Sequence, residues 1–172
     1  LMNLFDILFH YVLFTSQSKN IDESHGLSHS MDVLVNAHTL YKEQVVKYPI
    51  LQKQENIIYI SAFLHDMCDK KYMNEEKGIE ELNKVLYTKI NNIDVPSFDL
   101  KEEDIVCVKN IIRTMSYSKV KKNGFPDLGH YQTAYHIVRE SDLLAGYDFD
   151  RAMIFDLKNK KKDSLEKTFW DS

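Results

Sequence analysis

The sequence predicts an all-α fold, a bundle of about six or seven helices in a single domain over residues 1–172. Apolar residues recur at helical spacing through most of the chain. Only five glycines and three prolines interrupt it, which suits a helical protein with few tight turns. No alternating apolar run has turn residues at both ends, so strand signals are weak. We expect helices at residues 3–16, 28–48, 55–68, 75–91, 101–117 and 131–145, and a further one after Asp148.

Local signals support several of these boundaries. The helix at 3–16 is too short to span a bilayer and is expected to pack on the domain. Ser24 and Ser28 are candidate caps before the helix at 28–48. The stretch VPSFDLKEED combines a proline break with acidic residues that suit the first turn of the next helix. The stretch KKNGFPDLG, with Asn-Gly, Pro and Gly close together, is typical of a loop.

Composition narrows the class of protein. A net charge of −4 gives no electrostatic reason to expect a nucleic-acid partner, and the basic run Lys158–Lys162 is interpreted as a solvated turn. Cys68 and Cys107 are the two cysteines, which favours a reducing, cytoplasmic setting and excludes a cysteine-rich zinc site. No membrane partner or targeting segment is expected. The end, DSLEKTFWDS, stops inside an amphipathic pattern, so we expect the native chain to continue past Ser172.

The stretch SAFLHDMCDKKY places His65 and Asp66 side by side after an apolar run. Neighbouring helical residues point about 100° apart, yet both could reach a metal held in the seam with another helix. An imidazole and a carboxylate suit Mn²⁺, Fe²⁺, Co²⁺, Ni²⁺, Zn²⁺ or Mg²⁺. The alternative is a plain hydrogen bond between the two side chains at a helix end.

Two further segments carry candidate ligands. His25 and His29 stand four residues apart at a helix start, in ESHGLSHSMDVLVNA, where a capped surface helix with incidental histidines is the alternative. In AYHIVRESDLLAGYDFD, Asp142 interrupts an apolar stretch, and a buried charge is costly unless it is paired or binds a metal. An ion pair between Asp142 and Arg139, three residues earlier, is the other interpretation.

Together these segments resemble the HD-domain superfamily of metal-dependent phosphohydrolases. HGLSHSMDV resembles its first-histidine helix, AFLHDMCDKKY its signature motif and HIVRESDLLAGYDFDRA its last-aspartate helix. The resemblance covers most of the chain and implies an HD-domain helical bundle. It implies one divalent metal ion held by His29, His65, Asp66 and Asp142.

The chain is most similar to the small stand-alone members, in which Asp and Lys follow the HD pair. Members with two metals use extra histidines on intervening helices, and NIIRTMSYSK carries none here. His130 and His136 come too late in the order to replace them, which favours a mononuclear site. Ser141 also departs from the usual pattern before the last aspartate, without consequence for coordination.

The implied activity is hydrolysis of a phosphate ester or anhydride in a small phosphorylated molecule, expected to be a nucleotide, by a metal-activated water. Asp66, Asp69 and His25 are the candidate catalytic residues, although Asp69 could instead cap its helix. Positive or donor groups near a phosphate would be chosen from Lys70, Lys71, Arg113, Ser118 and Lys119, each of which could equally be a solvated surface residue. Aromatic residues that could stack on a base are Tyr117, Phe125, Tyr131, Tyr147 and Phe149.

Other classes of function stay open from the sequence. Among enzymes, a cyclic-nucleotide phosphodiesterase competes with a phosphomonoesterase, and a degenerate fold could bind a nucleotide or a metal as a sensor without turnover. A helical interaction module is a third possibility. The full set of four ligand positions argues against a degenerate site, and the missing second-metal histidines lean toward a phosphomonoesterase or a pyrophosphohydrolase.

Overall fold

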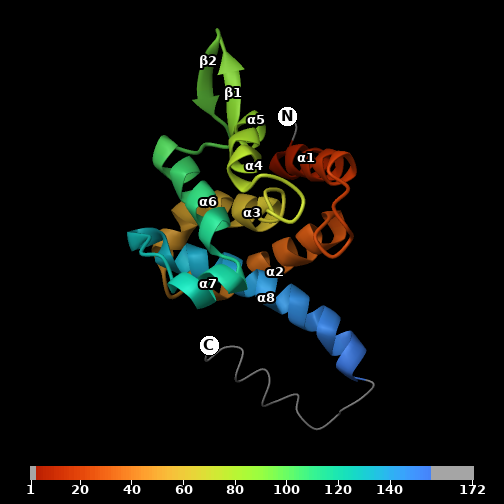
Figure 1. Ribbon diagram of the computed structural model, residues 1–172. Coiled ribbons are helices and arrows are strands. Elements are labelled where there is room, and N and C mark those ends of the chain that lie inside the picture. Colours follow the sequence, from red (N-terminus) through yellow and green to blue (C-terminus); the bar gives the residue numbers. More distant parts are fainter. Residues whose placement is uncertain (1–2, 156–172) are drawn as a thin grey trace.

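The structure is a computed structural model that describes residues 3–155, with side-chain surroundings for residues 3–146. The described chain is mostly helical, with one two-stranded sheet (Figure 1), which confirms the all-α fold class. The α-helices longer than one turn are α1 (Leu4–Ser18), α2 (Leu27–Val45), α3 (Glu55–Leu64), α4 (Glu75–Glu81), α6 (Glu102–Thr114), α7 (Tyr117–Asn123) and α8 (Gln132–Phe155). The remaining elements are α5 (Asn83–Leu86), the 3₁₀ helices η1 (Pro49–Gln54) and η2 (Gly129–Tyr131), and the strands β1 (Tyr87–Ile90) and β2 (Ile93–Pro96).

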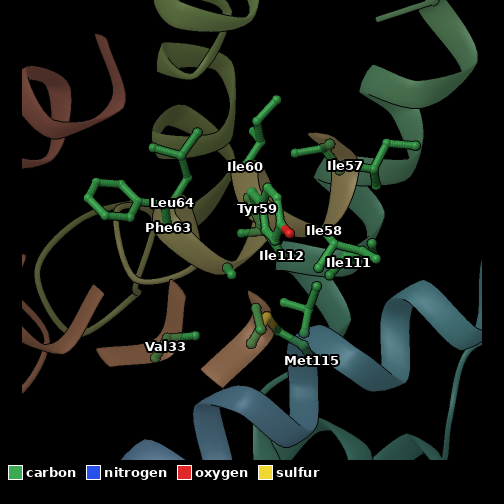
Figure 2. Close-up of a cluster of buried hydrophobic side chains, with 14 of the residues drawn as sticks. Val33, Ile57, Ile58, Tyr59, Ile60, Phe63, Leu64, Ile111, Ile112 and Met115 are labelled. Carbon is green, nitrogen blue, oxygen red and sulfur yellow. The ribbon is translucent and has the colours of Figure 1, made fainter. Parts of the chain in front are cut away.

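Helix α3 lies at the centre of the fold, in contact with α1, α2, α6 and α8. Every residue of α3 from Ile57 to Leu64 is buried, as expected for a helix that is apolar on all sides. Figure 2 shows the larger of these side chains, those of Ile57 to Ile60, Phe63 and Leu64, in one cluster with Val33 of α2, Ile111 of α6 and Met115. The residues that directly follow α3 therefore start from a well-packed core.

The long helices lie close to their expected positions. Helices α1, α2 and α6 begin within one residue of the expected starts, and α8 continues through Phe155, so the further helix expected after Asp148 is the same helix. The acidic start of α6 is confirmed, because the backbone N–H of Lys101 donates to the Asp104 carboxylate at 2.8 Å. The expected caps of α2 are wrong: its N-cap is Gly26, which has no side chain to offer.

Two expected helices end earlier than their apolar pattern suggests. Helix α3 stops at Leu64, so His65 and Asp66 lie just beyond it in a series of turns. The helix expected at 101–117 stops at Thr114, and the Ser116 hydroxyl then accepts from the Lys119 N–H to begin α7. The expected loop KKNGFPDLG is shorter than its pattern, because its first three residues belong to α7.

The helix expected at 75–91 is wrong. It divides into α4, the single turn α5 and an antiparallel hairpin of β1 and β2. Asn91 and Asn92, with φ of 52° and 62°, form the two-residue turn, and positive φ at both positions is what a tight hairpin turn requires. Thr88, Ile90, Ile93 and Val95 are β-branched residues that favour strands over a helix. The hairpin projects from the helical body at the top of Figure 1.

No helix among the described residues combines the length and apolar character needed to cross a bilayer. The basic run Lys158–Lys162 lies outside the described residues, as do the side chains of Tyr147 and Phe149. Within the described part, α2 and α8 lie side by side and both contact α3 (Figure 1). The seam among these three helices is where the candidate ligands meet.

Candidate metal centre

Four residues from three separate parts of the sequence meet at the seam of α2, α3 and α8. His29 lies in the first turn of α2, His65 and Asp66 directly follow α3, and Asp142 lies within α8. Because the three helices pack against one another, the side chains on α2, on α8 and directly after α3 come close together. The structure therefore brings together all four residues expected to hold a metal, hereafter the ligand cluster.

The distances within the ligand cluster fit a shared cation. The Nε2 atom of His29 lies 3.3 Å from Nε2 of His65, 3.3 Å from Oδ2 of Asp66 and 2.9 Å from Oδ1 of Asp142. The Nε2 atom of His65 lies 3.2 Å from the same Asp66 oxygen and 3.1 Å from the same Asp142 oxygen. Donor atoms that bind one cation at about 2.0–2.1 Å, at tetrahedral or octahedral angles, lie roughly 2.8–3.4 Å apart. The donor set thus has both the chemistry and the spacing of a metal site.

The orientation of His65 is fixed by the helix it follows. Its Nδ1 lies 2.7 Å from the carbonyl oxygen of Ala62, to which it donates a hydrogen bond. In the neutral imidazole this hydrogen bond keeps the proton on Nδ1, so the lone pair of Nε2 would point into the ligand cluster, as coordination of a metal requires. The last turn of α3 therefore prepares His65 for coordination.

Burial and charge act together on these groups. His65 and Asp66 are buried, with 8 % and 9 % of their surface exposed. Burial disfavours the charged form of His65, but the carboxylates of Asp66 and Asp142 outweigh it and raise its pKa well above the ordinary value. Burial likewise opposes ionisation of Asp66 and Asp142, but His65 lowers the pKa of Asp66 to about 2 and that of Asp142 further below its usual range. Two ionised carboxylates in a partly buried site favour a positive partner, which a divalent cation would supply.

His25 lies beside the ligand cluster, on the turn that precedes α2. Its Nδ1 donates to Oδ2 of Asp66 at 3.0 Å, and this hydrogen bond, against the effect of burial, raises the pKa of His25. Asp22 holds the turn in place by accepting hydrogen bonds from Ser24, Tyr72 and Lys71. The turn that carries His25 is thereby tied to the loop that follows the HD pair.

His25, Asp66 and Asp69 form a second group of side chains whose ligand atoms lie within reach of one cation. Asp69 also has a structural role, because its Oδ1 accepts a hydrogen bond from the backbone N–H of Lys71 at 2.8 Å. Asp69 does not cap α3, since that helix has ended at Leu64. The structure therefore brings the three expected catalytic residues together, with His25 and Asp69 next to Asp66.

A cleft of about 260 Å³ opens beside the ligand cluster. His65, Asp66 and Asp142 lie in its wall, together with residues from α4, α6, α7 and the loop after the HD pair. All three lysines expected to bind phosphate, Lys70, Lys71 and Lys119, line this cleft. Ser118, also expected near the phosphate, lines it as well. The cleft thus joins positive and hydroxyl groups to the candidate metal centre.

Some of these cations already have partners. The Nζ atom of Lys119 pairs with the carboxylate of Glu75, and that of Lys71 lies 3.2 Å from Asp22. No ion pair among the described residues includes Lys70, which is exposed at the edge of the cleft. Arg113 does not line the cleft: its guanidinium binds the Glu76 carboxylate through Nε and Nη2, each at 3.2 Å.

Several cleft residues were not expected from the sequence. Cys68, Glu75, Ile112, Met115 and Ser116 line the cleft. The one usable signal was Ser116, a good helix N-cap residue after an apolar run. The other four residues carry no chemical pattern that separates them from ordinary core and surface positions.

The expected stacking residues lie elsewhere. Phe125 packs over the Arg139 guanidinium, 5.0 Å from its ring centre, and the hydroxyl of Tyr131 donates to Asp104 at 2.9 Å. Tyr117 is exposed at the start of α7 and is absent from the cleft wall. The ion pair considered between Arg139 and Asp142 is not formed, and Asp142 instead faces the two histidines.

Comparisons with known proteins leave the site to be interpreted from its own geometry. The chain matches no family model, no curated protein and no solved structure.

Proposed function

We propose that this chain is a metal-dependent phosphohydrolase of the HD-domain type, which binds one divalent cation through the ligand cluster. One observation carries the proposal: the Nε2 atoms of His29 and His65 lie 3.3 Å apart, and each lies 2.9–3.3 Å from a carboxylate oxygen of Asp66 and from one of Asp142. The order His29, His65–Asp66 and Asp142 is that of the superfamily. A mixed nitrogen and oxygen set suits Mn²⁺, Fe²⁺, Co²⁺, Ni²⁺, Zn²⁺ or Mg²⁺.

A bound divalent cation supplies an acidified water and neutralises charge on a phosphoryl oxygen. The chain itself supplies the surroundings. Lys70, which lines the cleft and forms no ion pair among the described residues, would bind and orient the negative oxygens of a phosphate. Lys119 and Lys71 also line the cleft, but they already pair with Glu75 and Asp22. His25 and Asp69 lie where they could hold or transfer a proton beside Asp66.

The cleft suits a small phosphorylated substrate. Its volume of about 260 Å³ is just below the range that drug-sized ligands occupy, so it would hold a phosphoryl end and the group next to it. We propose a phosphate ester or anhydride of a nucleotide or a similar small molecule as the substrate. Arg113 is left out of the substrate contacts because Glu76 already binds it.

The test measures phosphate release from nucleoside mono-, di- and triphosphates with Mn²⁺. The wild type would run beside Asp66→Ala and a matched control, Asp94→Ala, which removes an exposed aspartate of the hairpin. We expect release by the wild type and by Asp94→Ala, and none by Asp66→Ala. Metal content, measured on the same samples, should fall in Asp66→Ala and in Asp142→Ala, while the helical circular dichroism signal persists.

Two outcomes would reject parts of this proposal. Stoichiometric metal in both Asp66→Ala and Asp142→Ala would reject the ligand cluster as the metal site. Bound metal without release from any nucleotide would reject the phosphomonoesterase and pyrophosphohydrolase assignment. Release of a mononucleotide from a cyclic nucleotide would then identify a diesterase, and binding without turnover would identify a sensor.

A further inference from the structure

A second cavity, of about 430 Å³, lies along the seam of α2 and α8, where α2 ends and α8 begins. Its wall includes Gln44 and Tyr48 from the end of α2 and the turn after it, Thr133 and Arg139 from α8, and Phe125 from the loop after α7. None of these residues lines the cleft at the ligand cluster. The volume lies within the range typical of small-molecule sites.

Arg139 is the unusual residue of this cavity. It is only 7 % exposed, and its Nε is buried without a hydrogen-bond partner. No ion pair or side-chain hydrogen bond among the described residues includes its guanidinium. An arginine cannot lose its charge to relieve this burial, and among the described residues no acceptor pairs with its guanidinium.

The surroundings define the chemistry of a group that could pair with Arg139. The ring of Phe125 lies 5.0 Å from the guanidinium carbon, which holds the side chain of Arg139 by a cation–π contact. His136, in the same wall, accepts a hydrogen bond from Gln132 at 3.3 Å, and burial, followed by the charge of Arg139, lowers its pKa. Arg139 is therefore the permanent positive charge in the wall of this cavity, and half-exposed Tyr48 and Phe125 add aromatic surface.

We infer that this cavity binds a small oxyanion that carries an aromatic ring, with the oxyanion on Arg139 and the ring against Phe125 and Tyr48. Arginine presents a planar fork of donors that matches a phosphate or a carboxylate. The carboxyl group of Glu140 also lines the cavity and opposes an anion. This inference does not depend on the proposed hydrolase activity, because the two sites share no residue in their walls.

The test uses the full chain, treated with a chelator, and isothermal titration with phenyl phosphate, benzoate, inorganic phosphate and phenol. We expect one of the two aromatic oxyanions to bind in a one-to-one ratio and more tightly than either inorganic phosphate or phenol. The stronger of phenyl phosphate and benzoate shows which oxyanion the site prefers. Absence of binding by both aromatic oxyanions would overturn the inference.

Substitutions of single residues test whether the aromatic oxyanion binds in this cavity. Arg139→Gln should weaken it about tenfold or more, because a charge-assisted contact is lost. Arg113→Gln makes the same chemical change at an arginine that Glu76 already pairs, and it should leave the affinity within about twofold of the wild type. Equal affinity in Arg139→Gln and the wild type would place the anion elsewhere, for example at the ligand cluster, and would overturn the inference.

Two further variants keep the test valid if Arg139→Gln does not fold. Gln44→Phe places a larger side chain in the wall of the cavity, which Gln44 lines from α2, and it should abolish binding. Glu140→Gln removes the opposing charge and should tighten binding. Unchanged affinity in Gln44→Phe would reject this cavity as the site.

Discussion

His25 illustrates how a single residue can serve the ligand cluster without belonging to it. Its Nδ1 donates to the Asp66 oxygen that also faces His29 and His65. A hydrogen bond of this kind orients a ligand carboxylate and holds it ready for the metal. His65 is held in a comparable way by the carbonyl of Ala62. His65 is thus held through its outer ring nitrogen, Nδ1, whereas Asp66 is held through Oδ2, the oxygen that faces the two histidines.

This arrangement predicts different outcomes at the two histidines of the HGLSH stretch. Removing a partner that orients a metal ligand typically weakens metal binding by about 10- to 100-fold. We therefore expect His25→Ala to bind metal with an affinity reduced by about that factor, and His29→Ala to lose the metal. Titration of the chelator-treated protein with Mn²⁺ would measure both. If His25→Ala lost the metal as completely as His29→Ala, His25 would be a ligand itself.

The cysteines lead to a second prediction at this scale. Cys68 and Cys107 are 2 % and 4 % exposed, and burial raises the pKa of Cys107 to about 12. Because the thiolate is the reactive form, we expect both thiols to react slowly with a thiol reagent at pH 8 in the folded protein. Both should react rapidly in guanidinium chloride. Rapid reaction without denaturant would show that the packing around one of these cysteines opens readily.

Among the short elements, α4 supports the loop that carries the HD pair. Its Gly78 is buried, and a methyl group at that position would lie 3.0 Å from Cα of Cys68 and 2.8 Å from Sδ of Met73. Only a glycine lets the helix approach the backbone of Cys68 this closely. Helix α4 therefore helps to fix the turns that follow His65 and Asp66.

The prediction for α4 compares two glycines. Gly78→Ala should destabilise the protein by about 1–3 kcal/mol through overpacking. Gly146→Ala, at an exposed position of α8 with nothing within 4 Å of the new methyl group, should be neutral or stabilise by about 0.5–1 kcal/mol. Urea unfolding of the three proteins measures the difference. Equal stability of Gly78→Ala and the wild type would show that α4 can move away from the loop.

At the scale of the elements, the sequence predicted the positions of the long helices well and those of the short helices poorly. The 3.6-residue apolar period identified α1, α2, α6 and α8, because burial of one helix face needs that pattern over several turns. Helices α4, α5 and α7 are too short for a period to be distinctive. The hairpin was missed because Asn91–Asn92 is a weaker turn signal than Asn-Gly, although it adopts the same positive φ values.

For the site, the sequence pointed to the four residues that the structure brings together, but not to the wall of the cleft. His29, His65, Asp66 and Asp142 follow a recognisable order of residue types. Glu75 and Ser116 reach the cleft because α4 and the start of α7 pack near the HD pair, which is a property of tertiary packing. Arg113 fits a phosphate-binding pattern in the sequence, but its pairing with Glu76 could be known only from the structure.

On the scale of the whole molecule, the ligand cluster lies between helices from near the two ends of the described chain. Asp142 and His29 are 113 residues apart in the sequence, so a cation bound there links the second helix of the chain to the last described one. A ligand that binds only the folded state raises stability in proportion to the logarithm of its concentration above the dissociation constant. Metal binding should therefore be visible in the global unfolding transition.

We expect Mn²⁺ at about 100 times its dissociation constant to stabilise the fold by about 2.7 kcal/mol. For a chain of this length, that corresponds to a rise in melting temperature of roughly 5–11 °C. Asp142→Ala should show no rise at the same Mn²⁺ concentration. Thermal unfolding followed by circular dichroism measures both, and an equal rise in the two proteins would mean that the stabilising ion binds outside the ligand cluster.

The projecting hairpin has a practical consequence. Its turn, Asn91–Asn92, is exposed at the tip and lies away from α2, α3 and α8 (Figure 1). Exposed turns of this kind accept inserted sequence better than any packed element does. A short epitope or a peptide for surface immobilisation, inserted between these two asparagines, would give a handle for single-molecule and binding measurements while the ligand cluster stays in place.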